Sequence, residues 1–401
     1  MTTPIAAAVT GSWTKTGDLP AAASWHGQYD GAVLLKDGKG VVLLGGADAS
    51  GAATNKVARY DIAEKKWTAG ATSLAFPRRL HTVTRLDDGT FLVVGGTSGS
   101  GPHAAGLTAV EKYDPADGSL KTVASLHEAR RGHSAVLLES KKVLVAGGLA
   151  SRTTDSDRAL ATAEIYDPAT DKWTPTKHPM TDARGGHGAV LFKGGKVLVT
   201  GGTAPVSKDG STSLAYCELY DPTGDSWSPV ASLAQPRSRH RTVLASDTTA
   251  LVIGGETPGT AGDGTYDPYH ALTVERFDLA AGTWTARPST AGGRALHAVV
   301  PLGSGKFLVA GGTTDEAGGI GYQSALIYDD TGTGGWSAAA GLAEGRWAGA
   351  ATALAAGTAL VTGGIVASGI AAADPTRAEL TATTEVFSFT ATPSALGGGA
   401  A

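Results

Sequence analysis

The stretch Val143-Leu-Val-Ala-Gly147-Gly148 decides the fold, because versions of it occur seven times along the chain. Each occurrence is a short aliphatic run that ends in a pair of glycines. The first glycines of the seven pairs are Gly45, Gly95, Gly147, Gly201, Gly254, Gly311 and Gly363. Their separations of 50 to 57 residues define a repeat of the length that is typical of propeller blades.

The first six repeats share a second landmark, an aromatic residue that in five of them is followed seven or eight positions later by tryptophan. Five repeats keep both residues: Tyr60/Trp67, Tyr166/Trp173, Tyr220/Trp227, Phe277/Trp284 and Tyr328/Trp336. The second repeat has Tyr113 but Leu120 in place of the tryptophan. The runs between landmarks are short, β-branched or aliphatic, and bounded by Gly, Asp and Pro, which favours strands. We therefore predict an all-β, seven-bladed propeller with four antiparallel strands per blade, as one domain over residues 1–401.

These landmarks resemble kelch repeats, and the resemblance covers residues 8–390. It implies the kelch β-propeller fold and an architecture like the central propeller of galactose oxidase. It implies little about function, since kelch propellers include scaffolds, lectin-like binders and unrelated enzymes.

The two ends of the chain are predicted to close the ring together. The seventh glycine pair is followed by a third-strand sequence, Thr384–Phe389, but by no tryptophan. Trp13 has the same Ser-Trp-Thr or Lys-Trp-Thr setting as the repeat tryptophans, so residues 1–17 are expected to supply the closing strand. The alternative is an incomplete last blade. Residues 391–401, rich in Gly and Ala, are expected to form a flexible tail.

Composition excludes several classes of protein. The chain has 33 basic and 37 acidic residues and a pI near 6.2, which gives no electrostatic footprint for nucleic acid or an anionic membrane. The single cysteine, Cys217, excludes an intramolecular disulfide and Cys-rich metal sites. No signal peptide or membrane-spanning run is recognisable, so we expect a cytoplasmic protein. The oligomeric state is left open.

Five histidines share one position, fourteen residues before the first glycine of the next pair. They are His81, His133, His187, His240 and His297. One interpretation is a ring of imidazoles that binds a transition metal such as copper, zinc or iron. In galactose oxidase this position can carry a copper-ligating histidine, but the crosslinked Tyr–Cys pair has no counterpart here. The other interpretation, which we favour, is a hydrogen bond across each interface between blades.

Arginines recur seventeen residues before the same glycines. They are Arg78, Arg130, Arg184, Arg237, Arg294 and Arg346. Guanidinium groups near one mouth of the channel would bind a carboxylate or a phosphate. Glutamates also recur, two residues before the aromatic landmark, at Glu111, Glu164, Glu218, Glu275 and Glu385. Buried ion pairs are therefore the alternative, except where Leu326 or Ala58 replaces the glutamate.

The repeat is broken at the seam between its last and first copies. There the sequence reads Trp25-His26-Gly-Gln28-Tyr29-Asp30-Gly31 and Arg346-Trp347-Ala-Gly349. We interpret His26, Tyr29, Asp30 and Trp347 as candidate catalytic residues of a pocket, although closing blades are often irregular anyway. The longest loop after a glycine pair, residues 256–270, contains Glu, Asp, Tyr and His that could supply metal ligands or an acid–base pair. Glu256 and His270 are its candidate catalytic residues.

Two functional hypotheses follow. The first is an enzyme or binder of a small or anionic molecule at the channel mouth, with or without a His-held metal, as in bacterial kelch enzymes such as sialic-acid epimerases. The second is a non-catalytic interaction propeller that binds an acidic peptide or a glycan.

Overall fold

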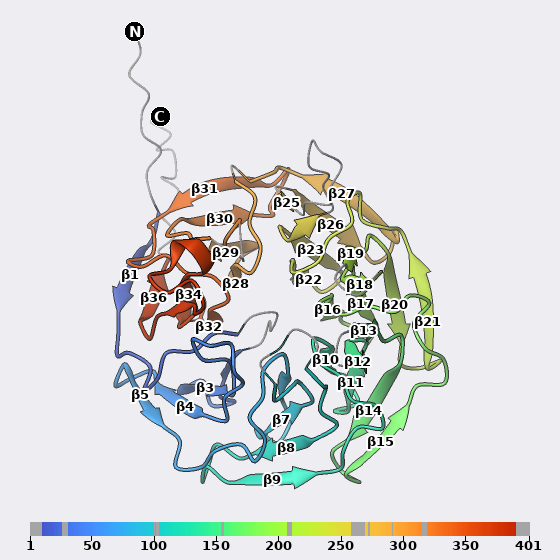
Figure 1. Ribbon diagram of the computed structural model, residues 1–401. Helices are drawn as coiled ribbons and strands as arrows, with labels where there is room; N and C mark the ends of the chain where they lie inside the picture. The colour runs from blue at the N-terminus through green and yellow to red at the C-terminus, as the bar shows by residue number, and fades with distance from the viewer. Residues whose placement is uncertain are drawn as a thin grey trace, which may run out of the picture.

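The structure of this protein is a computed structural model. It describes residues 10–25, 31–99, 101, 104–153, 156–206, 211–257, 269–271, 273–290, 292–314 and 319–389. Over these residues, seven four-stranded antiparallel sheets stand around a central axis as the blades of a propeller (Figure 1). The predicted fold class is confirmed.

The blades are numbered in chain order, and the strands of each blade run in sequence from the axis outward. Blade 1 has β2 (Ala32–Leu34), β3 (Gly40–Leu44), β4 (Val57–Asp61) and β5 (Lys66–Ala69). Blade 2 has β6 (Thr82–Arg85), β7 (Phe91–Val94), β8 (Val110–Tyr113) and β9 (Leu120–Val123). Blade 3 has β10 (Ser134–Leu137), β11 (Val143–Ala146), β14 (Ala163–Asp167) and β15 (Lys172–Pro175). Blade 4 has β16 (Gly188–Leu191), β17 (Val197–Thr200), β20 (Cys217–Asp221) and β21 (Ser226–Val230).

The remaining blades repeat this order. Blade 5 has β22 (Arg241–Ser246), β23 (Thr249–Ile253), β26 (Val274–Asp278) and β27 (Thr283–Arg287). Blade 6 has β28 (Ala298–Gly303), β29 (Lys306–Ala310), β30 (Ala325–Asp329) and β31 (Gly335–Ala339). Blade 7 has β32 (Ala350–Ala355), β33 (Thr358–Thr362), β36 (Thr384–Ser388) and, from the other end of the chain, β1 (Ser12–Lys15).

The core lies between blades. In strand β11 every residue is aliphatic and buried, because both faces of the sheet are covered by neighbouring blades. One buried cluster joins Leu92 and Val94 of blade 2 to Val143, Val145 and Trp173 of blade 3. No blade can bury its faces alone, so the hydrophobic effect favours the closed ring.

The aromatic landmarks fasten the outer strands. Tyr166 and Trp173 are directly opposite across β14 and β15, with ring centroids 5.0 Å apart. The Trp173 indole donates to the carbonyl of Ala124, at the end of blade 2, over 2.8 Å. Trp173 therefore joins blade 3 to blade 2.

The ring is closed by the N-terminal strand, as predicted. β1 pairs along its whole length with β36, and Figure 1 shows it at the outer edge of the last blade. Trp13 packs against Phe387 with centroids 5.0 Å apart and donates to the carbonyl of Ala340 at the end of blade 6. It thus plays the part of the tryptophan that the seventh repeat lacks.

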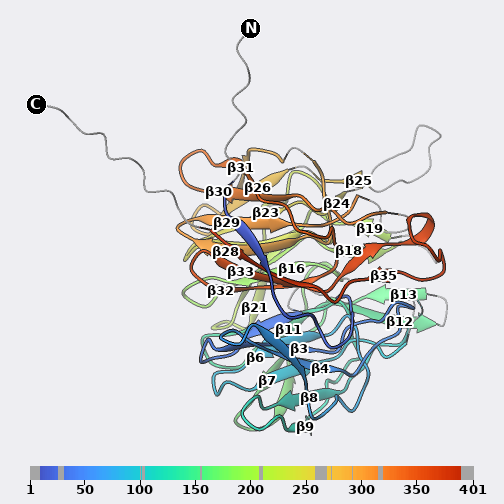
Figure 2. The same ribbon diagram turned by 90° about the vertical axis from the view of Figure 1, so that its left-hand side faces the viewer.

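Loops after the glycine pairs carry two-stranded ribbons. These are β12 (Leu149–Thr153) with β13 (Ser156–Ala159), β18 (Thr203–Pro205) with β19 (Ser211–Ser213), β24 (Glu256–Thr257) with β25 (Tyr269–His270), and β34 (Ile365–Ala367) with β35 (Glu379–Leu380). A single-turn helix, η1 (Gly369–Ala371), follows β34. Figure 2 shows the ribbons on one face of the ring, which we call the ribbon face. Among the described residues, no helix has the length and apolar character needed to cross a membrane.

Candidate functional site

The innermost strands of all seven blades surround a cavity of about 310 Å³ on the axis. Its lining is made largely of small side chains, with the hydroxyls of Thr82, Ser134, Thr242 and Thr352 among them. Four of the five repeat histidines also border it: His81, His133, His187 and His240. The chemistry of the channel therefore depends on what these imidazoles bond to.

Each of these histidines lies at the start of an innermost strand and reaches the preceding blade. Nε2 of His133 is 3.0 Å from Thr82 Oγ1, and Nε2 of His187 is 2.9 Å from Ser134 Oγ. Nε2 of His240 bonds to Thr200 Oγ1 over 2.9 Å, and Nε2 of His81 bonds to the carbonyl of Leu44 over 2.8 Å. These bonds are of the interblade kind that the sequence suggested as the alternative to a metal ring.

The paired glycines make room for the imidazoles. A Cβ on Gly147 would lie 2.7 Å from Cε1 of His187, and a Cβ on Gly202 would lie 2.8 Å from Cβ of the same histidine. Both glycines also have positive φ, at 63° and 104°. Glycine is thus required both for close approach and for the backbone conformation.

Burial keeps the histidines neutral. Loss of hydration lowers the pKa of His81 and of His187 to about 3, and the positive charge of the neighbouring arginine acts in the same direction. The same causes lower the pKa of His133 and His240. In the part of the chain that the structure describes, no three His, Cys, Asp or Glu side chains are grouped closely enough to hold one metal ion. Metal binding by this ring stays a prediction.

The repeat arginines turn into their own blades. Nη1 of Arg184 donates to the carbonyls of Gly201 and Tyr216 at 2.8 and 2.6 Å, and Nη2 pairs with Glu218 at 3.0 Å. The carboxylate also accepts the backbone N–H groups of Thr181 and Asp182 in the loop that enters the blade. The same pairing joins Arg78 to Glu111, Arg130 to Glu164, Arg237 to Glu275 and Arg346 to Glu385.

Arg294 has no glutamate opposite it, because Leu326 occupies that position. Its Nη1 donates to the carbonyl of Gly311, and its Nη2 donates to Ser324 Oγ at 3.1 Å. The guanidinium carbon is 5.3 Å from the centroid of the Tyr322 ring, within cation–π range. Burial lowers the pKa of this arginine, as it does for Arg78, Arg130, Arg237 and Arg346.

Blade 1 departs from the register that counting back from its glycine pair predicts. That count places Gln28 at the arginine position, but the backbone places Ala23 there. Gly364 N–H donates to Ala23 O at 2.8 Å, as Gly148 N–H does to Arg184 O. Gly31 directly precedes the innermost strand, as the histidines do elsewhere, so residues 26–30 are an insertion. Ala23 lies ten residues after Trp13, just as Arg294 lies ten residues after Trp284. Counting forward from the tryptophan would therefore have placed Ala23 at the arginine position.

The predicted seam and loop residues are described only in part. His26, Tyr29 and Asp30 lie outside the described residues. Trp347 is buried in a cluster with Leu296 and Ile365, and Trp25 belongs to a different cluster of buried residues. Glu256 pairs with Arg239 at 2.8 Å, and its backbone is opposite that of His270 in the β24–β25 ribbon. The His270 side chain lies outside the described part.

Around the channel mouth on the ribbon face, backbone hydrogen bonds join blade 2 to blade 3, blade 3 to blade 4, blade 6 to blade 7 and blade 7 to blade 1. The residue two positions after each repeat arginine has φ between 50° and 59°, at Leu80, Gly132, Gly186, Arg239, Leu296 and Ala348. Gly132 N–H donates to Leu80 O, and Gly186 N–H donates to Gly132 O, both at 2.8 Å. Ala348 N–H donates to Leu296 O, and Trp25 N–H donates to Ala348 O. These left-handed residues form the rim of the channel.

Cationic side chains stand beside this rim, at positions that the sequence analysis did not single out. Arg79 donates to the carbonyls of Gly99 and Gly101 at 3.1 and 3.0 Å. The charge of Arg131, one blade on, adds to burial in lowering the pKa of Arg79, and Arg131 Nη1 donates to the carbonyl of Ala104 in the same loop at 3.4 Å. Arg131 pairs with Asp157 on β13 at 2.5 Å. The signal in the sequence was the doubled Arg-Arg at 78–79 and 130–131.

The comparisons with known proteins agree with this geometry. A family described as the KLHDC2/KLHL20/DRC7 Kelch-repeats domain matches residues 7–202, and the Kelch motif matches residues 184–234. Given the repeat landmarks and the seven blades, the chain belongs to the kelch-repeat β-propeller family.

Similar curated proteins include human Kelch-like protein 34, which is 28% identical over 58% of this chain and 34% of its own length. Mouse Kelch-like protein 36 is 27% identical over 69% of this chain and 42% of its own length. The matched part therefore spans only about a third to two fifths of those relatives.

Two solved structures share the fold. A fungal alcohol oxidase of the AA5 family, in complex with copper, superimposes with a TM-score of 0.70 at 14% identity, over 95% of this chain and 76% of the oxidase. A structure titled YjhT gives a TM-score of 0.60 at 17% identity, over 80% of this chain and 99% of the other. At these identities the likeness concerns the fold alone.

Proposed function

We propose that this protein is a non-catalytic interaction propeller that binds an acidic peptide segment on its ribbon face. The observation that carries the proposal is the pair of guanidiniums beside the channel rim that donate to one loop, Arg79 to the carbonyls of Gly99 and Gly101 and Arg131 to that of Ala104. Two guanidiniums at one loop suit carboxylates, which arginine binds through its planar array of donors.

The grouping of guanidiniums near the rim supports an anionic ligand. Three cations, Arg79, Arg131 and Arg239, stand near the rim, and the carboxylates of Asp157 and Glu256 pair with the second and the third. Three guanidiniums are thus grouped near the rim, although the chain as a whole is formally negative at −4. Such local complementarity steers and orients an acidic partner.

The inner histidines and arginines give less support to catalysis. The histidines bond to the preceding blade and the arginines bond within their own blade, so these bonds satisfy buried polar groups of the fold. A catalytic role would rest on His26, Tyr29, Asp30 and the loop before His270, which lie outside the described residues. The proposal therefore follows the second hypothesis.

Fluorescence anisotropy with a labelled deca-glutamate peptide tests the proposal, and deca-glutamine is the uncharged control. We expect the glutamate peptide alone to bind, with an affinity that falls as salt is raised. Arg79→Gln should weaken binding by about fivefold, the usual size of one partly exposed charge contact. Arg59→Gln is the matched control, since Arg59 donates to Pro115 O at the β8–β9 turn on the other face. Equal binding of both peptides, or no effect of Arg79→Gln, would refute the proposal.

A further inference from the structure

Blade 1 lacks both halves of the buried ion pair that other blades contain. Ala23 stands at the arginine position, and Ala58 stands at the glutamate position, two residues before Tyr60. Replacing both partners together leaves no unpaired buried charge. It does leave the space that the two long side chains would occupy.

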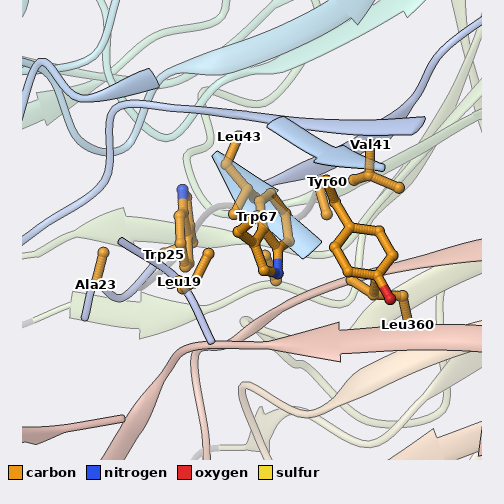
Figure 3. Packing of buried hydrophobic residues seen from close by; sticks show 10 residues of the cluster. Leu19, Ala23, Trp25, Val41, Leu43, Tyr60, Trp67 and Leu360 are labelled. Atoms are coloured by element: carbon orange, nitrogen blue, oxygen red, sulfur yellow. The ribbon is translucent and has the colours of Figure 1, made fainter. Parts of the chain in front are cut away.

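A cavity of about 250 Å³ lies at this place. It is lined by Gly45, Lys56 and Ala58, the counterparts of Gly95, Ala109 and Glu111, which bind the Arg78 side chain in blade 2. The opposite side of the cavity is formed by residues 19–23 and Trp25. Figure 3 shows Leu19, Ala23 and Trp25 beside Leu43 and Trp67 in the surrounding cluster.

Two residues of the cavity lining each carry a buried polar atom that has no hydrogen-bond partner among the described residues. These atoms are the indole Nε1 of Trp25, a side chain only 3% exposed, and the hydroxyl of Thr54. Buried polar groups are nearly always hydrogen-bonded, and an unpaired one costs free energy. A ligand that bonds to these atoms would remove that cost.

We propose that this cavity binds a small neutral molecule, a monocyclic aromatic or a short-chain compound that carries one oxygen function. Its apolar body would contact the alanines, Leu19 and Leu43, and its oxygen would accept from Trp25 Nε1 and bond to the Thr54 hydroxyl. A volume of this size exceeds the roughly 150 Å³ of an engineered cavity that binds benzene. We expect a charged ligand to bind poorly, because alanines replace the buried Arg–Glu pair that could compensate its charge. The site is independent of the acidic segment proposed for the ribbon face.

The proposal is tested by fluorine NMR titration of the full chain with 4-fluorophenol, with fluorobenzene and 4-fluorobenzoate as comparison probes. We expect saturable binding of 4-fluorophenol, weaker binding of fluorobenzene and none of 4-fluorobenzoate. Ala58→Leu, which fills the cavity, should weaken 4-fluorophenol binding by at least tenfold and leave the thermal unfolding temperature unchanged or raised. Ala286→Leu is the control, since Ala286 is an exposed position of β27.

A second variant isolates the hydrogen bond. Thr54→Val keeps the shape of the side chain and removes its hydroxyl, so it should weaken 4-fluorophenol binding by about two- to tenfold, the range of one hydrogen bond. Fluorobenzene binding should change by less than about twofold in the same variant, because that probe forms no such bond. Thr68→Val on the exposed side of β5 is the control. The proposal is wrong if the wild-type protein does not bind 4-fluorophenol, or if Ala58→Leu binds it as tightly as the wild type.

Discussion

The five repeat histidines are the residues on which the metal hypothesis and the structural interpretation differ. Four of them hydrogen-bond to the preceding blade, through Leu44, Thr82, Ser134 and Thr200. Sequence reasoning found their shared position from spacing alone. It could not decide their orientation, because whether a side chain at the start of an innermost strand faces the axis or the next blade depends on strand tilt.

Buried neutral histidines make stability depend on pH. The unfolded chain binds a proton near pH 6.5, whereas folded His81 and His187, with a pKa of about 3, do so only near pH 3. Between these values the unfolded state holds more protons, so stability is fully present above pH 6.5 and is lost as the pH falls. Each such group contributes a slope of up to about 1.4 kcal/mol per pH unit.

Urea unfolding between pH 4.5 and 7.5 measures this dependence. His187→Gln should reduce the slope of unfolding free energy against pH by about one proton below pH 6. His178→Gln, at an exposed position, should leave the slope as in the wild type. An unchanged slope in His187→Gln would show that its imidazole is protonated in the folded protein.

Within the blade, the buried Arg–Glu ion pair is the feature that repeats, since five blades contain it. The sequence predicted the five pairs from the separate registers of arginine and glutamate, and it predicted their absence where Leu326 or Ala58 stands. It assigned the arginine position of blade 1 to Gln28 instead of Ala23, because residues 26–30 are inserted between that position and the innermost strand. The sequence pattern did not reveal the two-stranded ribbons, because the loops after the glycine pairs vary too much in length and composition.

Blade 6 has the repeat arginine, Arg294, but no glutamate opposite it, so it provides an internal control for the blades that contain the ion pair. Arg184→Met leaves Glu218 buried without its partner and should destabilise the protein by about 3–5 kcal/mol. Arg184→Met/Glu218→Leu should recover much of that loss, as an apolar pair replaces both charges. Arg294→Met should cost less than Arg184→Met, because no glutamate faces Arg294. Denaturant titration measures all three, and equal losses in Arg184→Met and Arg294→Met would contradict the argument.

For the whole molecule, closure depends on one short strand from the far end of the chain. The repeat pattern predicted both the seven blades and the closing strand, since Trp13 has the setting of the repeat tryptophans. Strand β1 covers the outer edge of β36, which would otherwise expose unpaired backbone groups.

Removing the Trp13 contacts tests this closure. Trp13→Ala loses the packing on Phe387 and the bond to Ala340 O, so we expect a loss of about 2 kcal/mol or more and concentration-dependent association through the freed edge. Trp336→Ala removes the equivalent side chain from blade 6, whose four strands are consecutive. It should destabilise the protein without association. Light scattering distinguishes the two variants, and a monomeric Trp13→Ala protein would count against the role of this strand.

The sharing of blade 7 between the two ends has a consequence for how such a protein changes in evolution. Unequal crossover inside the gene adds or deletes whole repeats, and each of the first six repeats supplies the four strands of one blade. The strand at the beginning still meets the three at the end, whatever the number between them. Duplication of a repeat would therefore change the number of blades in the ring but keep the pairing of β1 with β36 that closes it.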